Sequence, residues 1–147
     1  MYEFRAFKEG DLFEVMKIVN TEMKYEYSPD IYLSLQKAWP GGFIVVTYYQ
    51  RIIGFIMCGI TPIRSVRILL LVLRKEFTSR GIGNALVEKI IERTKARGLH
   101  RLTLEVRVGN AKAISFYKKM GFRSIDIAKG FYKDGEDAYI LEKVLSN

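Results

Sequence analysis

A single acidic residue lies in an otherwise apolar stretch of the chain, a few residues before a helix that carries a tyrosine. The stretch reads LEVRVGNAKAISFYKKMGF and contains Glu105 in a strand pattern and Tyr117 in a helical one. In the strand, Glu105 shares a face with Thr103 and Arg107, because successive side chains of a strand point to opposite faces. Two interpretations are open. The carboxylate could pair with Arg107 or another arginine on the sheet surface, or it could accept a proton in a reaction.

A second motif, VLRKEFTSRGIGNAL, joins a strand to a long helix through a polar turn. The first N–H groups of a helix lack partners within the helix and carry partial positive charge, so such a turn suits a phosphate. Gly81 and Gly83 would let the backbone approach an anion closely, and Arg80 adds a positive charge. The alternative is that the two glycines only shape the turn. The motif lacks the third glycine of a dinucleotide-binding fingerprint and the Gly-Lys-Ser/Thr of a P-loop.

The hydrophobic pattern around these motifs predicts a mixed α/β fold. The strand–helix–strand crossover over residues 66–108 should pair its two strands in parallel. Tyr49 and Gln50 are expected to form a hairpin turn. Strands are predicted over residues 2–7, 43–48, 51–60, 66–73, 101–108, 122–128 and 137–144, and helices over residues 8–23, 30–39, 81–97 and 111–120.

The composition is that of an ordinary globular protein and excludes several classes. The 147 residues, 49% hydrophobic and 27% charged, predict a single domain over residues 1–147. No apolar run reaches the roughly 18 residues of a membrane span, and the N-terminus has no apolar signal core. The one cysteine, Cys58, indicates a core residue of a cytoplasmic protein. His100 has no neighbouring histidine or cysteine, so no metal site is expected. The net charge of +8 is spread along the chain without a nucleic-acid-binding motif, so nucleic acid is not the expected partner.

The two motifs, together with the tail KGFYKDGEDAYILEKVL, resemble those of one protein family. The chain resembles the GNAT-superfamily acetyltransferases, and within them the RimI-like N-terminal (Nα) acetyltransferases. The resemblance is specific over residues 66–145 and only topological before them. It implies a GNAT fold, a mixed central sheet of about seven strands with four flanking helices. It also implies that acetyl-CoA binds in the V-shaped splay between the fourth and fifth strands.

The resemblance implies that acetyl-CoA is the donor and that its pyrophosphate lies on the N–H groups of the turn before the long helix. The pantetheine arm would follow the edge of the fourth strand, with Asn110 binding the arm and Tyr117 pointing at the thioester sulfur. One position departs from the family, because Thr78 stands where Gln or Arg is usual. The implied donor-site residues are Leu71, Val72, Leu73, Ser79, Arg80, Gly81, Ile82, Gly83, Asn84, Asn110 and Tyr117.

The resemblance also assigns catalytic roles to Glu105 and Tyr117. An amine must be neutral to attack a thioester, and the family places a carboxylate at the Glu105 position to take the proton, directly or through a water. Tyr117 would protonate the leaving thiolate or donate a hydrogen bond to it. The amine would attack directly, without an acyl-enzyme. Some relatives carry a histidine or tyrosine where Arg67 stands, and since arginine cannot act as a base, more of that role falls to Glu105.

The acceptor site implied by the family lies between the loop joining the first two helices and the hairpin before the last strand. Tyr25-Glu26-Tyr27 falls in the first and Phe131-Tyr132 in the second. A locally packed aromatic cluster is an equal alternative for the first group. The predicted substrate-binding residues are Tyr27, Arg67, Phe131 and Tyr132.

The expected acceptor is a protein or peptide N-terminus, for example of a ribosomal protein or a nascent chain. One alternative is a GNAT enzyme that acetylates a protein lysine or a small-molecule amine. Another is a basic RNA- or ribosome-binding module with a vestigial acetyl-CoA site. The sequence does not predict an oligomeric state.

Overall fold

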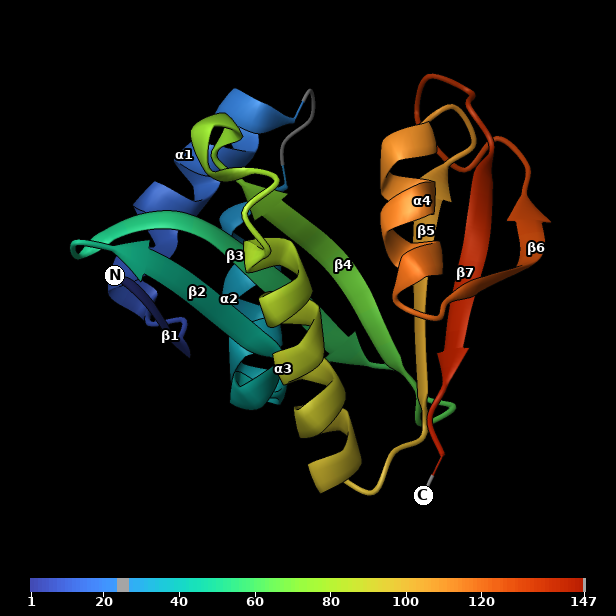
Figure 1. The fold of residues 1–147 in the computed structure, drawn as a ribbon, viewed down its shortest axis with the longest axis horizontal. Helices are drawn as coiled ribbons and strands as arrows, with labels where there is room; N and C mark the ends of the chain where they lie inside the picture. The colour runs from blue at the N-terminus through green and yellow to red at the C-terminus, as the bar shows by residue number, and fades with distance from the viewer. Residues whose placement is uncertain (24–26, 147) are drawn as a thin grey trace.

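The computed structural model describes residues 1–23 and 27–146 and contains a seven-stranded sheet with helices on both faces (Figure 1). The strand order is β1-β2-β3-β4-β5-β7-β6. Among the described strands, β4 and β5 are the parallel pair, as the crossover predicts, and the other neighbours are antiparallel. The strands are β1 (Tyr2–Ala6), β2 (Phe43–Tyr48), β3 (Arg51–Ile60), β4 (Val66–Leu73), β5 (Arg101–Arg107), β6 (Arg123–Ala128) and β7 (Ala138–Val144). The helices are α1 (Leu12–Glu22), α2 (Pro29–Ala38), α3 (Ile82–Ala96) and α4 (Ala111–Lys119).

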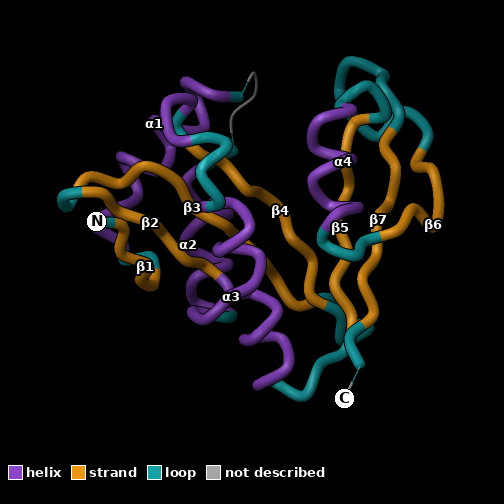
Figure 2. Tube along the Cα trace, viewed as in Figure 1, coloured by secondary structure: helices purple, strands orange, loops and turns teal. Residues whose placement is uncertain are grey.

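Two apolar cores form, one on each face of the sheet, and Figure 2 shows the helices and strands between which they lie. On one face α1 buries Val15 and Ile18, which are 0% exposed. On the other face α3 buries Leu86 and Ile90, the stripe that helical spacing predicts. None of the helices in residues 1–23 and 27–146 has the length and apolarity that a membrane crossing needs. The mixed sheet with its four helices confirms the predicted fold class.

One predicted boundary is wrong. The helix expected from Lys8 begins at Leu12, after a 3-10 turn at Glu9–Asp11. The Asp11 carboxylate accepts the backbone N–H of Lys8 at 2.8 Å and two guanidinium bonds from Arg5 at 2.7 and 3.0 Å. These bonds hold a turn where the hydrophobic pattern alone predicts helix. Most other element ends agree with the prediction to within one residue.

The parallel pair β4–β5 separates after a short contact. Its pairing consists of Val66 with Leu102 and Arg67 with Thr103. β4 nevertheless continues to pair with β3 as far as Leu73. The edge of β4 that faces β5 is therefore open from residue 68 to residue 73, which is the predicted splay.

A bulge in β4 accompanies this splay. The β3 partners on β4 skip from Ile68 to Leu70, so Leu69 is an extra residue. Before it, Val66 and Ile68 lie in the core under α3, and after it Leu70 and Val72 lie in the core under α1. An extra residue turns the following side chains to the other face, because side chains alternate with a period of two. The bulge leaves Arg67 on the face of the sheet that also carries Glu105.

Candidate active site

The turn before α3 has a backbone suited to an anion. Ser79 and Gly81 have left-handed φ angles of 63° and 81°. Gly81 is the N-cap of α3, and among the described residues no side chain caps the first N–H groups. Arg80 is exposed here, with Nη1 3.5 Å from the Tyr2 hydroxyl and its guanidinium carbon 5.4 Å from the centre of the Phe77 ring. A helix N-terminus, a left-handed turn and one cation are together able to bind a phosphate.

Gly83 has a packing role as well as the one predicted for it. A Cβ at this position would lie 3.3 Å from Cζ of Phe116, so the missing side chain lets α3 and α4 approach each other. Ile82 is buried at 3% exposure, whereas Asn84 is exposed.

The open edge of β4 carries the residues predicted to contact the pantetheine arm. Leu71 and Leu73 pack against the core under α3, and Val72 lies in the core on the opposite face. Since β5 has already diverged at these residues, the backbone groups of β4 that point toward it are available to a ligand. The predicted pantetheine residues therefore line the mouth of the splay.

Tyr117 lies buried in the core under α3, where it is 8% exposed. Its ring is edge-on to Phe116 and Phe122, at centroid distances of 4.9 and 5.4 Å. Burial raises the pKa of the Tyr117 phenol well above its ordinary value, and the nearby Cys58 thiol adds to the effect. The phenol is therefore protonated at neutral pH and able to donate a hydrogen bond.

Asn110 has a structural role that the donor prediction did not include. It is the N-cap of α4, and its Oδ1 accepts the N–H of Ala113 at 3.1 Å. The amide NH₂ group, a donor only, is the part of Asn110 that could still bind a pantetheine carbonyl.

Glu105 forms an ion pair with Arg67 across the point where β4 and β5 diverge. Nε and Nη2 of Arg67 lie 3.0 and 2.9 Å from Oε1 of Glu105. The Glu105 side chain is 17% exposed and that of Arg67 41%. The pairing predicted for the sheet surface thus exists, with Arg67 rather than Arg107 as the partner. Both contacts are made to one oxygen, so Oε2 can still meet a substrate.

Tyr132 interacts with two of the other residues predicted for the acceptor site, Tyr27 and Phe131. Burial raises the pKa of its phenol, the Arg107 guanidinium partly offsets the increase, and Glu105 and Tyr27 add to it. The hydroxyl therefore lies within electrostatic reach of Glu105 on β5 and of Tyr27 between α1 and α2. Phe131, which is 44% exposed, contacts the Tyr132 ring edge-on at 5.0 Å.

Two residues of this region were missed by sequence reasoning. Tyr32 on α2 is 0% exposed, and its hydroxyl has no hydrogen-bond partner among the described residues. Together with Tyr27 it lines a cavity of about 350 Å³ beside α1. Its place in an apolar helical pattern indicates only a core residue. Arg107 was considered only as a partner of Glu105, yet it bonds to the β6–β7 loop. Tyr25 and Glu26, which were predicted to belong to the acceptor wall, lie outside the described residues.

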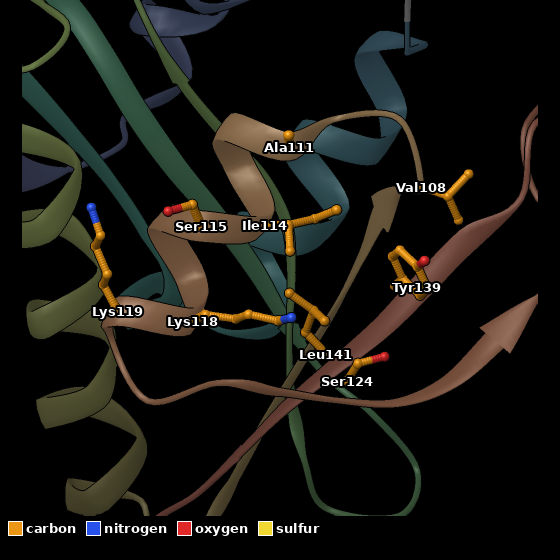
Figure 3. A pocket seen from close by; sticks show the side chains of 9 residues that line it. All are labelled: Val108, Ala111, Ile114, Ser115, Lys118, Lys119, Ser124, Tyr139 and Leu141. Atoms are coloured by element: carbon orange, nitrogen blue, oxygen red, sulfur yellow. The ribbon is translucent and has the colours of Figure 1, made fainter.

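A cavity of about 700 Å³ lies between α4 and the strands β6 and β7 (Figure 3). Lys118 extends across it toward Leu141, while Lys119 points to the side of α4 that faces α3. Ile114 and Tyr139 supply apolar walls. This cavity is separate from the splay between β4 and β5 and holds neither Glu105 nor Tyr117.

The splay between β4 and β5 and the turn with open N–H groups before α3 are typical of an acetyltransferase of the GNAT type. The chain belongs to the acetyltransferase (GNAT) family, whose model matches residues 12–122. It is 26% identical over 152 residues to the N-alpha-acetyltransferase of Sulfurisphaera tokodaii, covering 95% of this chain and 91% of the relative.

Two solved structures share the fold over almost the whole chain. Ard1 from Thermoplasma volcanium matches with a TM-score of 0.93 and 29% identity, covering 99% of both chains. The ribosomal-protein-S18-alanine N-acetyltransferase from Escherichia coli matches with a TM-score of 0.86 and 25% identity, covering 100% of this chain and 96% of that one. These similarities agree with the resemblance to RimI-like enzymes that the sequence motifs indicate.

Proposed function

We propose that the chain transfers the acetyl group of acetyl-CoA to the N-terminal α-amine of a protein or peptide. The observation that carries the proposal is the early divergence of β4 and β5, after Arg67 and Thr103. Donor groups line the side of the splay under α3, and Glu105 and the acceptor tyrosines lie on the opposite face. The relatives named N-alpha-acetyltransferase support the same acceptor class.

In this proposal acetyl-CoA is bound mainly by backbone groups of the protein. The pyrophosphate lies on the N–H groups of residues 79–84, with Arg80 adding charge. The pantetheine arm follows the open edge of β4 at Leu71 to Leu73, and the Asn110 amide donates to it. Backbone N–H groups near Leu73 polarise the thioester carbonyl, so that negative charge on its oxygen is stabilised during attack.

The chemistry is direct aminolysis of a thioester. The neutral amine nitrogen forms a bond to the carbonyl carbon, the C–S bond breaks, and the products are an amide and coenzyme A. Glu105 takes the amine proton, directly or through one water. Tyr117 stabilises the departing sulfur. Because the pKa of its phenol is raised and that of a thiol is about 8.5, a hydrogen bond to the thiolate is favoured over complete proton transfer.

Walls on two sides of Glu105 support an α-amine over a lysine side chain. Tyr27 comes from the loop after α1, and Tyr132 and Phe131 come from the loop after β6. A peptide that ends at the amine can enter between the two loops, with its backbone against the tyrosine hydroxyls. A lysine would need an open groove for the chain that continues on both sides of its stem.

The proposal is tested by measuring coenzyme A release with a thiol reagent. One set of peptides carries free Ser, Ala or Met termini, and a matched set has blocked termini and one free lysine. We expect turnover on free termini, and a loss of at least tenfold for Glu105→Gln, which corresponds to about 1.4 kcal/mol of transition-state stabilisation.

Glu92→Gln is the matched control, because Glu92 is exposed on α3 away from the splay. It should leave turnover unchanged. Turnover restricted to the lysine peptides would mean that the acceptor is a lysine side chain, while the proposed acetyl transfer would still hold. Full activity of Glu105→Gln would leave Glu105 as no more than the ion-pair partner of Arg67.

A further inference from the structure

Arg107, the last residue of β5, bonds to the loop between β6 and β7. Its Nη1 donates to Oδ1 and Oδ2 of Asp134 at 3.1 and 2.9 Å and to Oε1 of Glu136 at 2.8 Å. Without the guanidinium, the carboxylates of Asp134 and Glu136 would repel each other and each would turn toward water. Arg107 therefore draws this loop against the end of the strand that carries Glu105.

The loop is braced around this contact by its own backbone. The second oxygen of Glu136, Oε2, accepts the N–H of Gly109 at 3.0 Å. A Cβ on Gly109 would lie 2.8 Å from that oxygen, so a side chain there would push the carboxylate away. Asp134 accepts the N–H of Glu136 at 3.0 Å, and Tyr132 accepts the N–H of Gly135 at 2.9 Å. The carboxylates are thus held in place to receive the guanidinium.

The same guanidinium lies over the ring of Tyr132. Its central carbon is 4.0 Å from the ring centroid, which is the stacked geometry of a cation–π contact. The Phe131 ring contacts the Tyr132 ring edge-on. One side chain therefore fixes both the path of the loop and the plane of its tyrosine.

We propose that Arg107 is a positioning residue for the acceptor, which holds Tyr132 in the orientation that the incoming amine terminus requires beside Glu105. This inference rests on the proposed function, since it names what orients that acceptor site. Arg107 does not itself touch the reacting atoms. Without it, the loop would have to be ordered by the acceptor on binding, and the cost would appear as weaker acceptor binding. The donor site on the other face of the sheet would be unaffected.

The experiment compares Arg107→Met and Arg107→Lys with the unmodified protein. KM and kcat are measured for a free-terminus peptide at saturating acetyl-CoA, and acetyl-CoA affinity is measured separately by calorimetry. Arg107→Met should raise the peptide KM about tenfold, with a smaller change in kcat and an acetyl-CoA affinity within about twofold. Arg107→Lys keeps the positive charge but loses the planar guanidinium, which makes several hydrogen bonds and stacks on Tyr132. Its peptide KM should therefore lie between those of the unmodified protein and Arg107→Met.

Arg101→Met is the matched control, because Arg101 lies at the opposite end of β5 and pairs with Glu142 rather than with the loop. It should leave the peptide KM unchanged. Glu136→Gln should raise the peptide KM, and combining it with Arg107→Met should add little, since the two residues act through one contact.

The possible outcomes separate the two proposals. An unchanged peptide KM in a folded Arg107→Met protein overturns the positioning role while leaving the proposed function intact. Equal losses of peptide and acetyl-CoA binding also overturn it, because they indicate a general structural role. If the unmodified protein turns over no peptide terminus, the proposed function fails, and this inference fails with it.

Discussion

At the scale of single residues, the site separates a carboxylate from a phenol by the thickness of the sheet. Glu105 is 17% exposed on its side chain and forms an ion pair with the Arg67 guanidinium. Tyr117 is buried among aromatic rings, which keeps its hydroxyl protonated. The environment of Tyr117 favours the protonated phenol that the proposed chemistry needs.

Tyr117→Phe should lower kcat at least about tenfold, because a hydrogen bond to a charged group contributes about 1.5–3 kcal/mol. The pKa of the Tyr117 phenol is raised, so this group stays protonated at mildly alkaline pH and should not cause any alkaline loss of activity. The pH–kcat profiles of Tyr117→Phe and of the unmodified protein should therefore run parallel. Tyr49→Phe, at a hairpin residue that is 77% exposed, is the control. An alkaline loss of activity confined to the unmodified protein would contradict this protonation state.

At the scale of elements, the site depends on where regular structure is interrupted. The bulge at Leu69 leaves Arg67 on the same face as Glu105 and turns the rest of β4 over. The left-handed turn at Ser79 and Gly81 then starts α3 with its N–H groups open. If β4 paired with β5 along its whole length, its backbone groups on that edge would bond to β5 and could not bind a ligand.

Gly81→Ala tests the turn against a matched position. Gly81 and Gly98 have φ angles of 81° and 71°, and a Cβ on either would meet nothing within 4 Å. Both changes should lower the free energy of unfolding by about 1–2 kcal/mol, the cost of a left-handed alanine. Only Gly81→Ala should weaken acetyl-CoA binding, because Gly98 ends α3 far from its N-terminus. Equal acetyl-CoA affinities in the two variants would show that the turn does not bind the pyrophosphate.

At the scale of the whole molecule, the core buries acidic side chains in their neutral forms, among them Cys58 and Tyr117. Burial raises the pKa of the Cys58 thiol and of the Tyr117 phenol, from ordinary values of 9.0 and 10.0. In the unfolded chain both groups ionise at these ordinary values. The folded state therefore binds more protons above about pH 9, and its stability is present below that pH and lost as the pH rises.

Urea unfolding at a series of pH values checks this linkage. The free energy of unfolding of the unmodified protein should fall as the pH is raised above about 9. Cys58→Ala should be less stable at neutral pH because it leaves a cavity, but its stability should fall less steeply with pH. Identical slopes for the two proteins would mean that the Cys58 thiol is not shielded from water.

Much of this organisation could be predicted from the sequence, because it follows from local periodicity. Alternation in β5 separates Leu102 and Leu104 from Glu105, and the structure buries the first two in the core. The bulge at Leu69 could not be predicted, since β4 packs against an apolar core on each face and its apolar run gives no sign of which residue is extra. The contacts of Arg107 depend on a loop more than 25 residues away, which only the tertiary fold brings near.

The most direct test of the central claim is where the acetyl group is attached. One peptide with a free N-terminus and an internal lysine would be incubated with acetyl-CoA and the protein, and fragment-ion mass spectrometry would locate the acetyl group. We predict acetylation of the first residue, with the lysine unmodified, and loss of the product in Glu105→Gln. Acetylation of the lysine alone would contradict an N-terminal acetyltransferase.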